Sequence, residues 1–168
     1  MSGRNPVHRL LAGNDRSIGG TVYGTVLALA ALTAGAAEKQ SPRELLLLVA
    51  ATAAVIWVAH VYAHGLGESI ERGHRLDWKE FSGIARHELP ILIAAGGPTV
   101  VLVFGAVGLV DEQTDIWLAF AVGLASLAAQ GGRYARVERL GLIGTLLAVA
   151  ANLALGVLVV LLKVLVGH

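Results

Sequence analysis

The sequence predicts an all-α protein, a polytopic transmembrane bundle of five helices in a single domain, 1–168. The chain has 168 residues, of which 55% are hydrophobic and only 15% are charged. Its 21 glycines bring the apolar share to roughly two thirds, against about 45–50% in ordinary globular chains. Because about 20 residues cross a bilayer, five spans nearly exhaust the length. This composition disfavours a soluble enzyme, a nucleic-acid binder and a disordered chain.

The apolar residues fall into five segments. The first is predicted to be a retained helix and not a signal peptide, because it is long, lacks a small-residue cleavage site and is followed by further spans. Ser41 can cap the second, Pro42 suits its first turn, and Glu44 completes a capping box. The fourth is short, so it crosses nearly upright or thins the bilayer. The predicted spans are 18–37, 45–65, 89–110, 116–130 and 140–162.

Lys and Arg residues predict the orientation of these spans. With five spans, ten of the bases fall on one side and three on the other. The side with more bases is cytoplasmic in membrane proteins, so we expect a cytoplasmic N-terminus, a cytoplasmic loop over 66–88 and an outside C-terminus. Asp115 and Trp117 fit an outer interfacial anchor. The ten bases are Arg4, Arg9, Arg16, Arg72, Arg75, Lys79, Arg86, Arg133, Arg136 and Arg139, and the three are Lys39, Arg43 and Lys163.

The cysteine content, the net charge and the absence of catalytic motifs narrow the class of protein. The absence of Cys excludes disulfides, thiolate metal sites and Cys nucleophiles. A net charge of +1 is too small to attract nucleic acid, so we do not expect nucleic acid as a partner. No nucleophile–base pair or phosphate-cradling motif is present, so we do not expect an enzyme. Abundant Ala, Gly, Val, Leu and Arg with rare Lys is typical of a GC-rich bacterial genome, and we expect a multi-pass protein of the bacterial inner membrane.

Ionisable residues within a span are the first place to look for function, and they gather at the end of the second span. On a continuous helix Glu71, His64 and Glu68 lie about 20°, 40° and 80° around the axis from His60. Imidazole and carboxylate ligands suit a divalent transition-metal ion such as Fe, Mn or Zn, and the same groups could relay protons. Alternatively, Gly65 and its neighbours end the helix at His64, and a neutral His60 bonds an adjacent helix.

Two more residues extend this candidate cluster. His87 and Glu88 precede the third span, at the same membrane face as His64. Together with the acids of the second span they could collect cations. Because bases are interleaved through 66–88, a solvated charged face is the alternative interpretation. Tyr23 of the first span lies at a depth similar to that of His60 and is a candidate partner for it.

The third span contains a predicted break. Pro98 removes an amide donor and clashes with the preceding turn, and Gly97 softens the helix. Broken helices can coordinate substrates through freed carbonyls, which would place Gly97, Pro98 and Thr99 on a pathway. The alternative is a plain kink that a neighbouring helix satisfies.

The fifth span carries a stripe of small residues, Gly144, Ala148, Asn152 and Gly156, at four-residue spacing. Such stripes permit close helix approach, which predicts a tight bundle and a homo-oligomer or a membrane partner. Asn152 lies near the bilayer centre. It bonds across a helix contact, or it serves as a pathway ligand beside Pro98 and Thr99.

Two short motifs resemble those of the vacuolar iron transporter family. Glu68-Ser69-Ile70-Glu71 is similar to the E-x-x-E pairs with which that family binds divalent metal, and the turn 131–136 is similar to its basic turn before the last span. The sequence also resembles small actinobacterial integral membrane proteins. The resemblance implies five spans, a cytoplasmic N-terminus and a cytoplasmic acid-bearing segment between spans two and three.

Two functions from different classes follow. The first is a divalent-cation or proton-coupled carrier, with His60 and His64 as its first site and Glu68, Glu71, His87 and Glu88 at its mouth. The alternative is a non-transporting scaffold or accessory subunit, favoured by the small-residue stripes. Haem-linked electron transfer is a third hypothesis, in which His87 would have to supply the second axial ligand.

Overall fold

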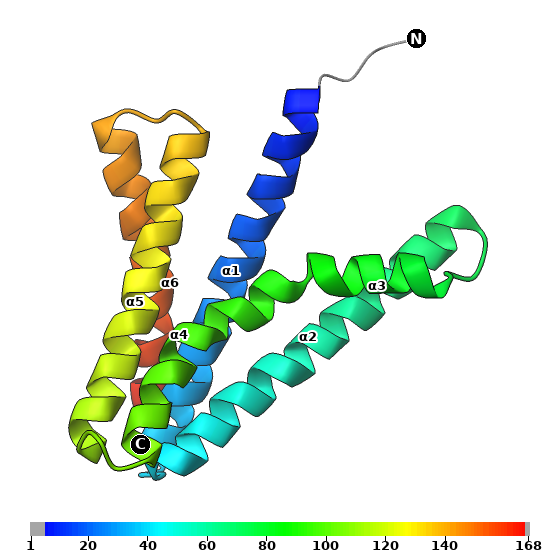
Figure 1. Ribbon diagram of the computed structural model, residues 1–168. Helices are drawn as coiled ribbons and strands as arrows, with labels where there is room; N and C mark the ends of the chain where they lie inside the picture. Colours follow the sequence, from blue (N-terminus) through cyan, green and yellow to red (C-terminus); the bar gives the residue numbers. More distant parts are fainter. Residues whose placement is uncertain (1–5, 167–168) are drawn as a thin grey trace.

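The computed structural model describes the backbone of residues 6–166 and the side chains of residues 18–161. Arg4 lies outside the described residues, as do the side chains of Arg9, Arg16 and Lys163. Within the described range the chain forms six α-helices and no strand (Figure 1). They are α1 (Pro6–Ala37), α2 (Pro42–Arg72), α3 (Trp78–His87), α4 (Leu89–Ala106), α5 (Glu112–Val137) and α6 (Leu142–Val166).

Five of the described helices, all except α3, are long and apolar enough to cross a membrane. The all-α prediction with five spanning helices is therefore confirmed, and the helices fit a multi-pass membrane protein. The sidedness of the termini stays a prediction. The fourth span is longer than the predicted 116–130, because the helix covers 26 residues, so it needs no local thinning of the bilayer.

The segment 66–88, predicted as a loop, is mostly helical. Helix α2 continues through Gly65 and ends where Gly73 adopts a left-handed φ of 68°. The aromatic ring of Phe81 packs over Gly65, where an added Cβ would lie 3.7 Å from it, and this contact offsets the low helix propensity of glycine. Asp77 then starts α3 as N-cap by accepting the amide N–H of Glu80 at 2.7 Å.

The helices divide into an upright bundle and a slanted arm (Figure 1). Helices α5 and α6 run antiparallel beside α1, while α2 slants away from them and carries α3 at its far end. Helix α1 lies in the middle, in contact with α2, α4, α5 and α6. The buried core contains Leu32 of α1, Leu45 and Val49 of α2, Leu102 of α4 and Ala119 of α5.

Helix α4 bends near its middle and belongs to both parts (Figure 1). The bend follows from Pro98, which is fully buried and lacks the amide that would bond the carbonyl of Ala94. The hydroxyl of Thr99 donates to the carbonyl of Ala95 at 2.7 Å, a back-bond that itself bends helices. The first half of α4 therefore lies along the arm, and the second half lies in the bundle.

Small residues bring the helices into close contact within one chain. An added Cβ at Gly24 would lie 2.5 Å from the carbonyl oxygen of Ile91, so α1 and α4 touch along their backbones. At Gly156 it would lie 2.8 Å from Leu127 of α5 and 3.4 Å from Leu29 of α1. This part of the small-residue stripe of α6 thus packs inside the chain, and a homo-oligomer stays a prediction.

Candidate functional site

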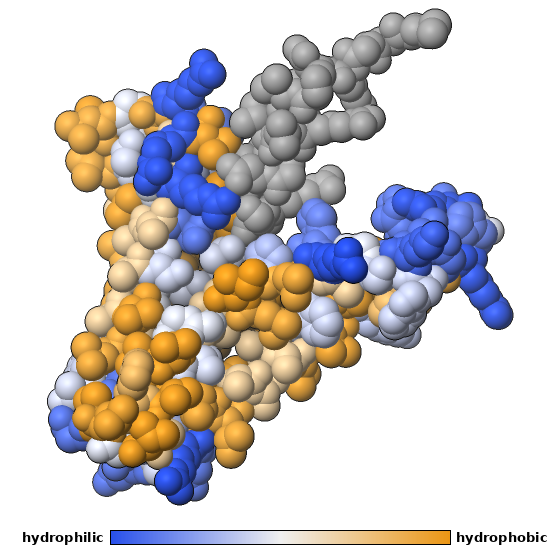
Figure 2. Space-filling view, in the orientation of Figure 1, coloured by the Kyte–Doolittle hydropathy of each residue, from blue (hydrophilic) through white to orange (hydrophobic). Residues whose placement is uncertain are grey.

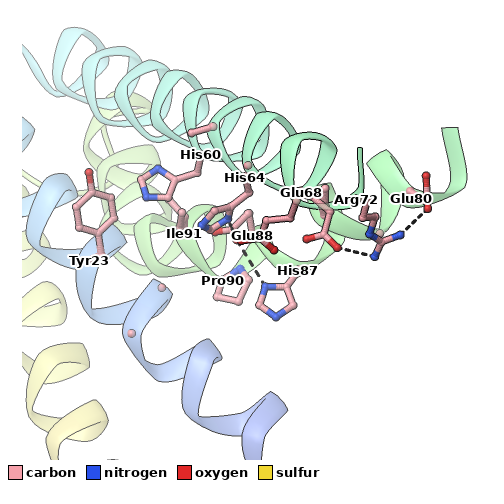
Figure 3. A pocket seen from close by; sticks show the side chains of 17 residues that line it. Tyr23, His60, His64, Glu68, Arg72, Glu80, His87, Glu88, Pro90 and Ile91 are labelled. Atoms are coloured by element: carbon pink, nitrogen blue, oxygen red, sulfur yellow. Dashed lines mark hydrogen bonds and ion pairs between the residues drawn. The ribbon is translucent and has the colours of Figure 1, made fainter. Parts of the chain in front are cut away.

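A cavity of about 850 Å³ opens between the arm and α1 (Figure 3). Its walls come from α1, α2, α3 and the start of α4. All seven polar residues predicted for the cluster and its neighbourhood line it, namely Tyr23, His60, His64, Glu68, Glu71, His87 and Glu88. They meet because α2 remains helical to Arg72, which keeps His60, His64 and Glu68 on one side of the helix (Figure 3).

At the inner end of the cavity, His60 lies against Tyr23. Their ring centroids are 4.9 Å apart, and the rings are tilted by 48°. Nδ1 of His60 lies 3.2 Å from the carbonyl oxygen of Ile56 one turn earlier. A carbonyl only accepts, so Nδ1 of His60 carries the hydrogen of this bond.

The next turn of α2 carries His64, which pairs with Glu88. Nδ1 of His64 donates to Oε1 of Glu88 across 2.6 Å. The Glu88 side chain is only 10% exposed, whereas the His64 side chain is 61% exposed. Nδ1 of His87 lies 3.6 Å from the same carboxylate oxygen. Glu88 thus fixes the tautomer of His64 and presents one negative charge to two imidazoles.

The outer mouth of the cavity is crossed by Arg72. Its guanidinium pairs with Glu68 of its own helix and with Glu80 of α3, each at 2.5 Å (Figure 3). Glu68 therefore faces Arg72 instead of completing a site with His60 and His64. Among the described residues, the cavity lining holds four carboxylates and this one guanidinium.

The predicted metal site is not supported. Among the described residues, no group of three His, Asp or Glu side chains is arranged to hold a metal ion. The reason lies in the pairing: His64 and Glu88 bind each other, and Glu68 binds Arg72. The cluster is brought together, but as hydrogen-bonded pairs in a row along the cavity.

The predicted pathway residues lie elsewhere. Asn152 donates to the carbonyl of Ala148 at 2.9 Å, within its own helix. It lines a second, mostly apolar cavity of about 530 Å³ between α1, α5 and α6, and among the described residues only Gly19 and Tyr23 line both cavities. Gly97 packs against Val122, where an added Cβ would lie 2.9 Å from the Val122 side chain. Pro98 lies at the bend of α4, and the Thr99 hydroxyl is bonded inside the helix; a role of these residues in a pathway stays a prediction.

Sequence reasoning missed the ion pairs that Arg72 forms with Glu68 and Glu80, and it missed the burial of Asp115. Arg72 lies four residues after Glu68, and Glu80 lies three after Asp77, so an i,i+4 pair and a capping box were the available signals. Asp115, predicted at an interface, is fully buried, whereas Trp117 beside it is 65% exposed. Oδ1 of Asp115 accepts the amide N–H of Gly105 at 3.1 Å, and Oδ2 has no hydrogen-bond partner among the described residues.

No protein-family model, curated protein or solved structure matches this chain. The resemblance to the vacuolar iron transporter family stays a prediction carried by the motifs at 68–71 and 131–136.

Proposed function

We propose that the protein is a proton-coupled cation carrier that works through the cavity between α1 and the arm. The observation that carries the proposal is the row of Tyr23, His60, His64 and Glu88 along this cavity. From here on these four residues are called the His–Glu row. With the predicted orientation, the row opens toward the cytoplasm of a bacterial cell and lies in its inner membrane.

The chemistry of the row suits proton exchange. Histidine side chains serve as proton donors and acceptors in relays, and the row places two of them in one cavity. A proton added to His64 would make an imidazolium that pairs with the Glu88 carboxylate, whose Oε1 lies 2.6 Å from Nδ1. A cation in the same cavity would repel that imidazolium and favour release of its proton. A cation and a proton then compete for the same negatively charged side chains of the cavity. This competition is the linkage that exchange requires.

We favour protons over a resident transition-metal ion. The donors of the row point at one another, and among the described residues no three of them converge. A divalent metal remains a candidate cargo, because carboxylates and imidazoles line the cavity together. Thermal stability of the purified protein with Fe, Mn, Zn, Co or Ni ions tests this: a rise that His60→Ala/His64→Ala abolishes would replace the proton proposal by a metal site.

The main experiment follows proton movement in proteoliposomes that hold the full chain and an internal pH dye. Inward gradients of Na⁺, K⁺ and Mn²⁺ are applied in turn. We expect at least one gradient to drive proton efflux, and His60→Ala/His64→Ala to reduce the rate at least tenfold. His74→Ala is the matched control, because His74 is exposed and does not line the cavity; it should keep the full rate.

Two results would count against the proposal. One is the same proton flux in the double variant as in the wild type, which would show that the row carries no protons. The other is no flux with any cation together with co-purification of a fixed partner, which would favour the scaffold or accessory-subunit alternative.

A further inference from the structure

Helix α3 connects two membrane-spanning helices, so it lies at the membrane surface. It follows the end of α2 and leads into α4, and both helices are long and apolar enough to span. Trp78, its first residue, is 79% exposed and stacks on Phe81 with ring centroids 6.1 Å apart. Tryptophan is typical of the boundary between headgroups and hydrocarbon.

The apolar surface of α2 leads up to this helix. Tyr62, Leu66 and Ile70 repeat every four residues and are 64%, 48% and 79% exposed. They lie on the side of α2 away from His60 and His64, because none of them lines the cavity. Figure 2 shows apolar surface along the arm that gives way to hydrophilic surface at its far end. Exposed apolar surface therefore continues along α2 nearly to its last turn, and α3 starts where this surface ends.

The charges of α3 and its preceding turn are separated by sign. Both acidic side chains have partners within the protein, because Asp77 caps the helix and Glu80 pairs with Arg72. Arg75, Lys79 and Arg86 are exposed. Lys79 and Arg86, seven residues apart, lie within about 20° of each other around the helix. In the part of the chain with described side chains, no ion pair is formed by these three bases.

We propose that α3 and its preceding turn bind the anionic phospholipid headgroups of the adjacent leaflet. The α3 surface that binds them consists of Arg75, Trp78, Lys79 and Arg86. Trp78 inserts at the hydrocarbon boundary, and the three bases contact phosphates. An exposed tryptophan beside unpaired bases is the composition of interfacial helices that select anionic lipid. A protein partner is disfavoured, because the bilayer already covers this level of α2.

The expected selectivity follows from the three charges. Each base near an anionic surface contributes roughly a fivefold preference. Removing all three should therefore reduce the preference for anionic over zwitterionic lipid by up to about a hundredfold. The effect should weaken with salt, because the Debye length falls from about 10 Å at 0.1 M to about 3 Å at 1 M.

The test uses the absence of cysteine from this chain. Ser82→Cys places a single thiol on α3, and Gln113→Cys places one on the first turn of α5. Each is labelled with a fluorophore in the reconstituted full chain. Brominated phosphatidylglycerol and brominated phosphatidylcholine, at equal mole fraction, then quench the label according to which lipid lies beside it. We expect stronger quenching by the anionic lipid at Ser82 and no difference at Gln113.

Variants and competitors decide the outcome. Arg75→Gln/Lys79→Gln/Arg86→Gln should abolish the difference at Ser82, while Arg136→Gln/Arg139→Gln, at the turn between α5 and α6, should leave it unchanged. Equal quenching by both lipids in the wild type overturns the proposal. So does a difference that survives in the triple variant. A difference that inorganic phosphate removes, while chloride of the same ionic strength does not, would show a free-phosphate site in place of a lipid surface.

Discussion

The backbone contact between α1 and α4 at Gly24 offers a sharp test of how the cavity wall is held. In Gly24→Ala the new Cβ would lie 2.5 Å from the Ile91 carbonyl oxygen and 2.9 Å from the Cβ of Ala94. Neither atom is the end of a flexible side chain, so the two helices must separate. Overpacking of this kind costs about 1–3 kcal/mol.

Gly19→Ala is the matched control on the same helix. An added Cβ at Gly19 meets nothing within 4 Å. Both substitutions gain the same helix propensity, up to about 1 kcal/mol, so the difference between the two variants isolates the steric effect. We expect Gly24→Ala to be less stable than Gly19→Ala by about 1–3 kcal/mol. For a chain of this size, that corresponds to roughly 2–12 °C in the melting temperature.

The assay is thermal unfolding in detergent, followed by the fluorescence of the three tryptophans. Gly19→Ala should melt at or slightly above the wild type, and Gly24→Ala below it. If Gly24→Ala melts as high as Gly19→Ala, then α1 and α4 do not touch at Ile91, and the described cavity wall is wrong.

Three further predictions follow. Gly105→Ala should destabilise the protein by about 1–3 kcal/mol, because its Cβ would collide with the Asp115 carboxyl; Asp115→Ala in the same chain should restore much of the melting temperature. Hydrogen bonds from Thr114 hold the pKa of Asp111 below its usual value, so Asp111 stabilises the fold above its unfolded pKa of about 3.9 and loses this effect as the pH falls through its folded pKa. The stability gap between wild type and Asp111→Ala should therefore be full at pH 7 and vanish in strong acid; a constant gap would exclude this cap. With the predicted orientation, an impermeant maleimide should label Ser82→Cys only after the inner membrane is opened, and labelling of intact spheroplasts would reverse the topology.

The spanning helices could be predicted from the sequence because lipid imposes a simple rule. A long apolar segment must satisfy its backbone internally, which leaves the helix as the solution. The candidate cluster was predicted for a related reason: with a helical period, His60, His64 and Glu68 lie on one side. The cavity that gathers them confirms this geometry, since all three line it.

The pairing inside the site could not be predicted in the same way. Whether Glu68 faces His64 or Arg72 depends on where α3 lies, and a helix of 10 residues is shorter than the windows of about 11–18 residues in which helical periodicity is read. The bond from the Trp57 indole to the carbonyl of Ala85, at 3.1 Å, helps to place it. This is a contact between distant segments with no local signal. The burial of Asp115 likewise depends on α4 packing Gly105 against it.

The bend of α4 has a consequence for the surrounding lipid. Its 18 residues measure about 27 Å along a straight axis, slightly less than the hydrocarbon thickness of about 30 Å, and a bent helix spans less than its length. Helix α2 beside it has 31 residues and is about 46 Å long. Helix α4 is therefore slightly too short to span, whereas α2, whose first and last turns carry charged residues, is longer than the hydrocarbon is thick and slants (Figure 1). Tilt accommodates α2, whereas the bilayer thins beside α4, so short-chain lipids fit around α4 better than long-chain ones.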